Sequence, residues 1–160
     1  LLKALLVYKY NGTNQIQFDV VGDGGNIESY KNIIESSEGS LKVNFKGYTP
    51  NPWDNINEYD ILVIPSYFEG FCLVAAEGAS LGIPIVGNNI LALREVLSFL
   101  PDSNFFDIHD PNSIHITITE CLTNILGQRT LALDNTAKIT DKFSKKRMLL
   151  NYLKAYESFS

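Results

Sequence analysis

The chain has 160 residues, of which 45% are hydrophobic and 19% charged, a composition that excludes a disordered chain and predicts one soluble domain. No apolar run reaches the roughly 20 residues that cross a bilayer, so no membrane span is expected. The formal charge of −5 is unevenly spread, because residues 47 to 128 hold ten acidic residues and one basic residue. This excludes nucleic acid as an expected partner, since Lys and Arg supply the affinity for phosphate backbones.

Hydrophobic periodicity predicts helices that alternate with strands along the chain. The expected elements are, in order, a helix over 1–10, a polar break over 11–15, a strand over 15–21, a helix over 27–36, a strand over 41–45, a short helix over 53–59, a strand over 60–64, a helix over 73–81, a strand over 83–86, a helix over 92–100, a strand over 105–108, and tail helices over 112–126, 129–140 and 144–159.

These elements define the expected fold class. Strands that are apolar on both faces and alternate with helices belong in a parallel sheet that is covered on each side. The sequence therefore predicts an α/β fold, a Rossmann-like doubly wound parallel sheet flanked by helices, in a single domain over 1–160 with a helical C-terminal appendage.

The start of the sequence and its cysteines bear on its origin. The chain opens at Leu1 within an apolar pattern, and its only methionine is Met148, whereas a natural start carries an initiator Met. We therefore expect a fragment of a longer protein.

Cys72 and Cys121 lie far apart in the sequence and match neither a zinc-ligand spacing nor a disulfide framework. Buried free thiols in a reducing cytoplasm are the expectation.

Three loops that follow strands are the expected location of a site, because ligands of open parallel sheets bind beyond the carboxyl ends of the strands. These loops are Gly22–Gly25, Gly47–Pro52 and Pro65–Phe71. The first could be a plain tight turn, and it lacks the third glycine of the dinucleotide-binding pattern. The third is the most informative, since a helix follows it directly.

The start of that helix favours an anion. Its unpaired amides and the positive end of its macrodipole attract a phosphate, and Gly70 permits close approach. Glu69 precedes the helix and Glu77 lies within it, so two carboxylates that accept hydrogen bonds from hydroxyls flank the phosphate position. A nucleoside diphosphate sugar combines these features.

The run over 60–97 resembles the donor-binding signature of the retaining glycosyltransferases of family 4, within the glycosyl transferases group 1. Their C-terminal domain is the nucleotide-sugar half of a GT-B fold. Val21–Gly24 and the strand end Val43–Gly47 are similar to motifs of the same family. So are Asp110-Pro111 before a helix and Phe143-Ser144 before the last helix.

This resemblance implies a role for each matching position. Glu69 would be the catalytic residue, at the hydroxyls of the donor sugar, and Glu77 would bind the ribose hydroxyls. The remaining donor-binding positions that it implies are Gly22, Gly24, Gly47, Tyr48, Ser66, Gly70, Phe71, Cys72 and Leu73.

The sequence departs from the family pattern at three places. Cys72 stands where the family usually has Gly, and Leu91-Ala92 stands where it often has a Gly pair. The family's diphosphate-binding Arg and Lys lie upstream of Leu1, and residues 47–128 offer only Arg94. Because cations that stabilise a leaving diphosphate are a major catalytic contribution, we expect the isolated chain to be inactive.

The implied function is transfer of a hexose from a UDP- or GDP-linked sugar to a glycan or lipid-linked acceptor. A missing N-terminal domain would hold the acceptor, and the helix over 141–160 would pack toward that domain. Neither a cofactor nor a metal is expected. The location would be cytoplasmic. The basic tail over 138–154 could make a peripheral contact with an anionic membrane surface. The alternatives are a sugar-nucleotide epimerase of similar architecture and a non-catalytic α/β binding domain.

Simpler roles stay open for individual residues. Glu69 and Glu77 could be solvated surface acids. His109 is more typical of a solvated or hydrogen-bonded residue than of a catalytic one, and the same applies to His115. Tyr67 and Phe68 favour packing within their loop over stacking on a ligand.

Overall fold

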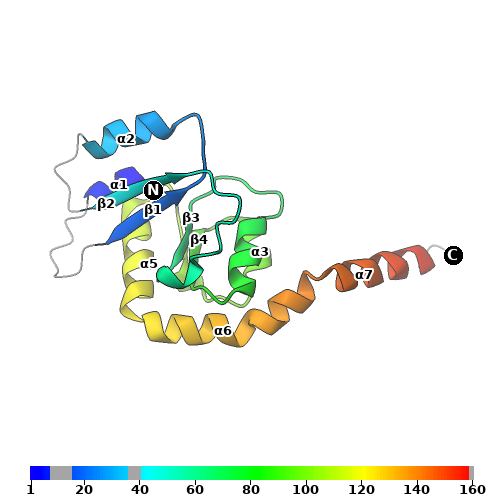
Figure 1. Ribbon diagram of the computed structural model, residues 1–160. Coiled ribbons are helices and arrows are strands. Elements are labelled where there is room, and N and C mark those ends of the chain that lie inside the picture. The colour runs from blue at the N-terminus through cyan, green and yellow to red at the C-terminus, as the bar shows by residue number, and fades with distance from the viewer. Residues whose placement is uncertain (8–15, 36–40, 159–160) are drawn as a thin grey trace.

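The computed structural model describes residues 1–7, 16–35 and 41–158, which form parallel β-sheets with helices on both faces (Figure 1). The alternation of strands and helices confirms the predicted α/β class. The expectations for residues 8–15, for Ser36 and for Phe159 lie outside the described residues. The elements are α1 (Leu2–Val7), β1 (Gln17–Val21), α2 (Ile27–Glu35), β2 (Lys42–Gly47), the 3-10 helix Ile56–Glu58, β3 (Leu62–Ile64), α3 (Leu73–Ser80), β4 (Ile85–Asn88), α4 (Leu91–Val96), the 3-10 helix Asp102–Asn104, β5 (Phe105–Phe106), α5 (Pro111–Thr123), α6 (Ile125–Lys142) and α7 (Lys145–Glu157).

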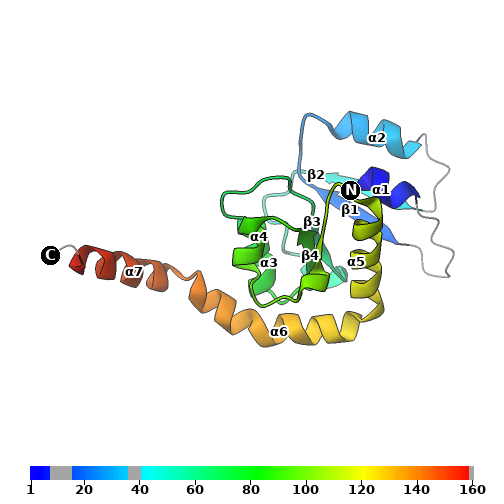
Figure 2. The same cartoon turned by 180° about the vertical axis from the view of Figure 1, so that it is seen from behind.

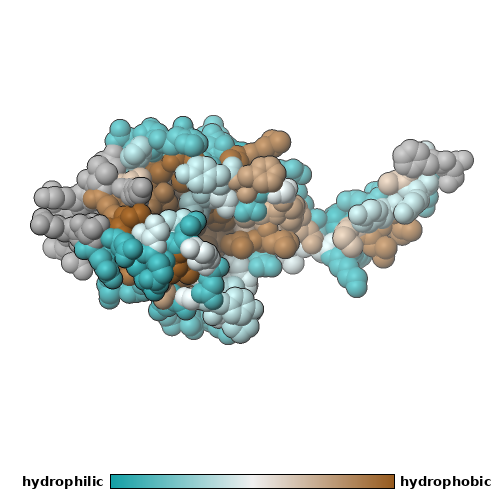
Figure 3. Space-filling model, turned by 90° about the horizontal axis from the view of Figure 1, so that it is seen from above, coloured by the Kyte–Doolittle hydropathy of each residue, from teal (hydrophilic) through white to brown (hydrophobic). Residues whose placement is uncertain are grey.

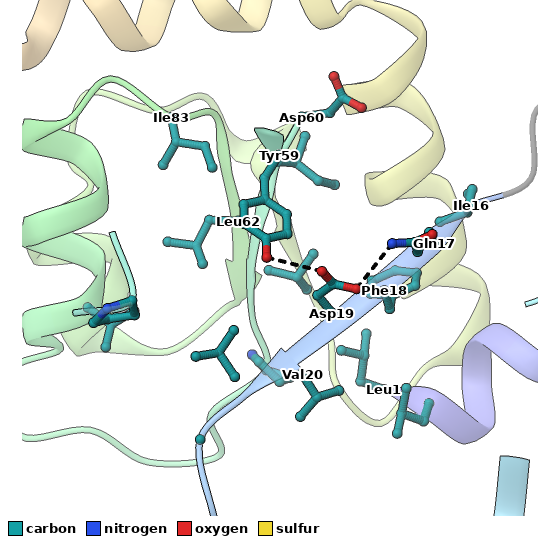
Figure 4. A pocket seen from close by; sticks show the side chains of 18 of the residues that line it. Leu1, Ile16, Gln17, Phe18, Asp19, Val20, Tyr59, Asp60, Leu62 and Ile83 are labelled. Atoms are coloured by element: carbon teal, nitrogen blue, oxygen red, sulfur yellow. Dashed lines mark hydrogen bonds between the residues drawn. The ribbon is translucent and has the colours of Figure 1, made fainter. Parts of the chain in front are cut away.

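The strands are divided between two parallel sheets, β1-β2 and β3-β4-β5, rather than joined in one. A cavity of about 1440 Å³ separates β1 from β3 and is lined by the consecutive residues 16–22 and 58–63 (Figure 4). Successive side chains of a strand point to opposite faces. A cavity that meets every residue of both segments therefore runs along the strand edges, between the two helical layers.

Two hydrophobic cores cover the faces of the β3-β4-β5 sheet. Ile85 of β4 packs into a core with residues of α3, α4 and α6, and its neighbour Val86 packs into a second core with residues of α1 and α5. Phe105 and Phe106 of β5 divide between the cores in the same way. Burial on both faces explains why these strands appear in the sequence as continuous apolar runs.

Several boundaries differ from the sequence prediction. The fourth strand lies at 85–88 rather than 83–86, and α4 ends at Val96 rather than near residue 100. Beyond Val96 the chain continues as a turn, in which the amide of Leu100 donates to the carbonyl of Leu97 at 2.9 Å. The local apolar pattern continues through this turn because Leu97 is buried in a core from outside a helix.

The last helix extends away from the rest of the molecule, as both ribbon views show (Figures 1 and 2). The Ser144 side chain accepts a hydrogen bond from the Arg147 amide at 3.1 Å and so begins α7. The helix has no buried residue, and it exposes apolar side chains that include Met148 and Leu149 (Figure 3). Across the residues that the structure describes, no helix is both long and apolar enough to cross a membrane.

Gly82 supports the packing of α3 against α6. Its φ of 76° lies in the left-handed region, and a Cβ there would stand 2.8 Å from Cδ2 of Leu133 and 3.2 Å from Cγ2 of Thr136. We predict that Gly82→Ala lowers the free energy of unfolding by about 1–3 kcal/mol, because both the backbone and the interface oppose a side chain. Urea unfolding followed by circular dichroism measures the change. Gly25→Ala is the matched control, since a Cβ at Gly25 meets nothing within 4 Å, and an equal loss in both variants would contradict the explanation.

Candidate functional site

The loops after β1 and β2 meet through two glycines. The amide of Gly22 donates to the carbonyl of Gly47 at 2.8 Å. Their φ values are 119° and 69°, a backbone region that favours glycine because other residues carry a Cβ. Both residues were predicted to bind the donor, and the structure places them in contact where their strands end.

A hydrogen bond from Trp53 connects the two sheets at the site. Its indole Nε1 donates to Oε2 of Glu77 at 2.9 Å. Trp53 belongs to the loop after β2, whereas Glu77 belongs to α3, which follows β3. Glu77 also lines the large cavity together with Gly22 and Tyr48, so the structure brings three of the predicted site residues to one cavity.

Trp53 is a site residue that the sequence analysis missed. The signal available was its place in a loop that follows a strand, together with its indole N–H, which needs an acceptor when it is partly buried.

Glu69 is held by its own loop. The Ser66 hydroxyl donates to Oε1 of Glu69 at 2.7 Å, and the Glu69 residue is half-buried. A carboxylate accepts at both oxygens, about four hydrogen bonds in all, so this bond leaves capacity for ligand hydroxyls. The cavity is lined by Glu77 but not by Glu69, so the two carboxylates predicted to flank the donor do not share it.

The N-terminus of α3 is open toward a ligand. Cys72 is its N-cap residue, and its side chain makes no capping hydrogen bond to the first turn. Cys72 is 3% exposed and belongs to a core, and burial together with the neighbouring Glu69 carboxylate raises the pKa of its thiol. Both Cys72 and Cys121 are buried free thiols, as the sequence predicts.

The other predicted positions differ in exposure. A Cβ at Gly24 or Gly70 meets nothing within 4 Å, so packing does not require glycine at either position. Leu73 is 65% exposed in the first turn of α3. The ring of Phe71 packs edge-on against Phe143, with centroids 5.1 Å apart, and so connects the loop to the end of α6.

The aromatic residues of this loop do not pack as expected. Phe68 is 85% exposed and Tyr67 69% exposed, so the interpretation of both as loop packing is wrong. The Tyr67 ring contacts the His109 ring at a centroid distance of 5.6 Å. Side chains of the loops that follow β3 and β5 therefore meet beyond the carboxyl ends of the strands.

Arg94 is already engaged. Its guanidinium forms an ion pair with Asp102, and its Nε donates to Oδ1 of Asn89 at 2.7 Å. The guanidinium also lies over the Phe105 ring, 4.0 Å from the centroid. The one basic residue of 47–128 is thus committed to contacts within the protein. In the part of the chain that the structure describes, no three His, Cys, Asp or Glu side chains gather as a metal site requires.

Asp19 is a buried carboxylate that the sequence analysis did not single out. Its side chain is 7% exposed and accepts from Nδ2 of Asn44 at 2.7 Å. It also accepts from the Tyr59 hydroxyl at 3.0 Å (Figure 4). Burial acts to raise its pKa, but these bonds, one from Gln17 and the charge of Lys46 outweigh burial and hold the pKa below its usual value. The carboxylate connects β1, β2 and the segment that leads into β3.

The comparisons with known proteins accord with this arrangement. The family model for glycosyl transferases group 1 matches residues 1–138. The chain is 26% identical over 154 residues to the O-antigen biosynthesis glycosyltransferase WclY of Escherichia coli. The matched region covers 96% of this chain and 42% of WclY. It is 35% identical over 72 residues to the poly(glycerol-phosphate) alpha-glucosyltransferase of Bacillus subtilis (strain 168). This matched region covers 45% of this chain and 11% of that protein.

The chain therefore belongs to the glycosyl transferases group 1 family. It spans less than half the length of the curated relatives that it matches. Its fold is shared with TarM, at a TM-score of 0.75 and 22% identity over 96% of this chain and 30% of TarM. The sucrose-phosphate synthase of Thermosynechococcus elongatus gives a TM-score of 0.72 and 19% identity over 99% of this chain and 41% of the synthase. The fold is that of one half of a GT-B glycosyltransferase.

The lowered pKa of Asp19 predicts acid-sensitive stability. Since the folded pKa lies below the unfolded one, the carboxylate stabilises the fold above pH of about 4, and this contribution is lost as the pH falls through the folded value. We expect Asp19→Asn to lower the free energy of unfolding by about 1–3 kcal/mol at pH 7. This difference from the unsubstituted chain should become smaller toward pH 3. Urea unfolding at both pH values measures it. The exposed Asp134→Asn is the control, and a gap that does not depend on pH would contradict the assignment.

Proposed function

We propose that the chain is the nucleotide-sugar-binding domain of a retaining glycosyltransferase that transfers a hexose to a glycan or lipid-linked acceptor. The observation that carries the proposal is the gathering of Gly22, Tyr48 and Glu77 at one cavity. Glu69 lies in the loop that leads into α3, beside the uncapped start of that helix. Donor sites of open parallel sheets occupy this position, beyond the carboxyl ends of the strands.

Each part of a nucleoside diphosphate sugar has a suitable partner. Glu77, held by Trp53, would accept from the ribose hydroxyls, and Glu69, held by Ser66, would accept from the sugar hydroxyls. The open amides of the first turn of α3 would receive the distal phosphate. The exposed ring of Tyr48, beside Gly47, would lie near the base.

The family and its relatives support the class of reaction. WclY is named as an O-antigen biosynthesis glycosyltransferase, and the Bacillus subtilis relative as an alpha-glucosyltransferase of poly(glycerol-phosphate). The second name fits a hexose donor and a polymeric acceptor, and the first fits polysaccharide biosynthesis. The motif resemblance over residues 60–97 supports the proposed retention of the anomeric configuration and the proposed membership of family 4.

In this proposal, only the longer protein catalyses the transfer. A leaving diphosphate needs cations that do not already serve another group, and Arg94 is paired with Asp102. The acceptor, the missing cations and the surface that receives residues 141–160 would belong to the remainder of the transferase. The proposed location is cytoplasmic, with a peripheral contact of the full-length enzyme at the inner face of the membrane. Its donor is UDP- or GDP-linked and needs neither a cofactor nor a metal.

Donor binding tests the function directly. We expect calorimetric titration of the full-length protein to show saturable binding of a UDP- or GDP-linked hexose, equally with Mg²⁺ and with EDTA. Binding that requires Mg²⁺ would overturn the metal-independent site.

The 160-residue chain should bind the donor weakly and should not turn it over. Turnover by this chain would contradict the need for further cations. Product formation without an acceptor would indicate the epimerase instead.

Glu69 tests the site. We predict that Glu69→Ala in the full-length transferase lowers kcat/KM by at least ~10²-fold, because an acceptor for the sugar hydroxyls is lost at the reacting end of the donor. Glu69→Gln keeps the shape and should retain more activity than alanine. Glu120→Ala, an exposed acid on α5, is the control. Unchanged turnover in Glu69→Ala would refute the assigned role.

A further inference from the structure

Asn88 is a buried amide whose two ends are both used. It is the last residue of β4 and is 5% exposed. Its Nδ2 donates to the carbonyl of Ser66 at 2.9 Å, and its Oδ1 accepts from the amide of Ile108 at 3.1 Å. One side chain therefore connects the loops that follow β3 and β5 across the end of β4.

These bonds begin where the backbone ladder ends. The pairing of β3 with β4 finishes at Ile64 and Gly87, and that of β4 with β5 finishes at Asn88 and Phe106. Beyond the last pairs, the Asn88 side chain continues the connection on both sides of the strand. The Asn88 side chain thus connects both loops beyond the carboxyl edge to the sheet, beside the backbone bond from the Asn89 amide to the Phe106 carbonyl at 2.8 Å.

The connection reaches the predicted catalytic carboxylate in two steps. The Ser66 carbonyl is held by Asn88, and the Ser66 hydroxyl donates to Glu69 at 2.7 Å. Glu77 depends on different contacts, since Trp53 holds it from the loop after β2. These hydrogen bonds therefore connect Asn88 to Glu69, on which the Cys72 thiol also acts, and not to Glu77.

We propose that Asn88 is a positioning residue that sets the place of the Glu69 carboxylate through Ser66, and thereby governs recognition of the sugar part of the donor. The inference rests on the proposed function, in which Glu69 binds the sugar and Glu77 the ribose. It separates two halves of the site: an Asn88-dependent half for the sugar and an Asn88-independent half for the nucleoside.

The structure provides a matched control in Asn104. This residue is 1% exposed, and its Nδ2 donates to the carbonyl of Ile85 at 2.9 Å, at the opposite end of β4. Asn104→Ala removes a buried amide of the same kind from the amino edge of the sheet. Asn88→Asp is the shape-conserving variant, because it keeps an acceptor for Ile108 and removes the donor to Ser66.

The test compares a nucleotide sugar with its own nucleoside diphosphate, by calorimetry on the full-length transferase. We expect Asn88→Asp and Asn88→Ala to weaken the nucleotide sugar by about 10-fold or more, the loss of a positioned hydrogen bond, and the diphosphate by less than about 2-fold. Asn104→Ala should lower Tm without this selective loss. Equal weakening of both ligands, no weakening at all, or the same selectivity in Asn104→Ala would overturn the proposal.

A second measurement needs no ligand. In ¹H–¹⁵N spectra of the 160-residue chain, Asn88→Asp should shift the amide signals of Glu69 and Gly70, while those of Gly22 and Gly47 stay in place. Unshifted Glu69 and Gly70 signals would overturn the positioning role by themselves. If the unsubstituted transferase binds no nucleotide sugar while these shifts are seen, the proposed function fails and the connection from Asn88 to Glu69 stands.

Discussion

Burial of β4 on every side is the constraint on which the rest of the structure depends. All four of its residues are buried, and it pairs with β3 on one edge and β5 on the other. Its side chains alternate between the two cores, with Ile85 in one and Val86 in the other. A shift of one residue in its pairing would exchange these faces, so the apolar pattern holds one register. That register places Asn88 at the edge where the loops of the site begin.

The site is assembled from hydrogen bonds, some between distant segments and one within a single loop. Gly22 meets Gly47, Trp53 meets Glu77, and Ser66 meets Glu69. The first two contacts cross between segments more than 20 residues apart. Carboxylates and amides suited to hydroxyls and phosphate are present, whereas Arg94 is spent on Asp102 and Phe105. This division of charge fits the proposed function, in which the domain contributes one part of a donor site.

Much of the local structure could be predicted because its signals are local. The turn at Gly22, the strand over 41–45, which the structure extends to Gly47, and the helix after Phe71 follow from short patterns of glycine, apolar residues and period. Burial of both thiols was predicted from their isolation in the sequence. The short helix expected over 53–59 is present as the 3-10 helix at 56–58. The early end of α4 and the exposure of Phe68 were not predicted, because packing between distant segments decides them. The assigned roles of Glu69 and Glu77 remain predictions, although their places in the fold are known.

By itself, the sequence determined the α/β class, the order of the elements and the loops where a ligand site belongs, because periodicity and turn chemistry act over a few residues. Only the tertiary structure decided that the strands form two sheets with a cavity between their edges. It alone placed Trp53 on Glu77, directed Cys72 into the core and made Asn88 the connection between loops. Hydrogen bonds of single side chains across 20 or more residues leave no periodic signal, and they exist only once the cores have set the distances.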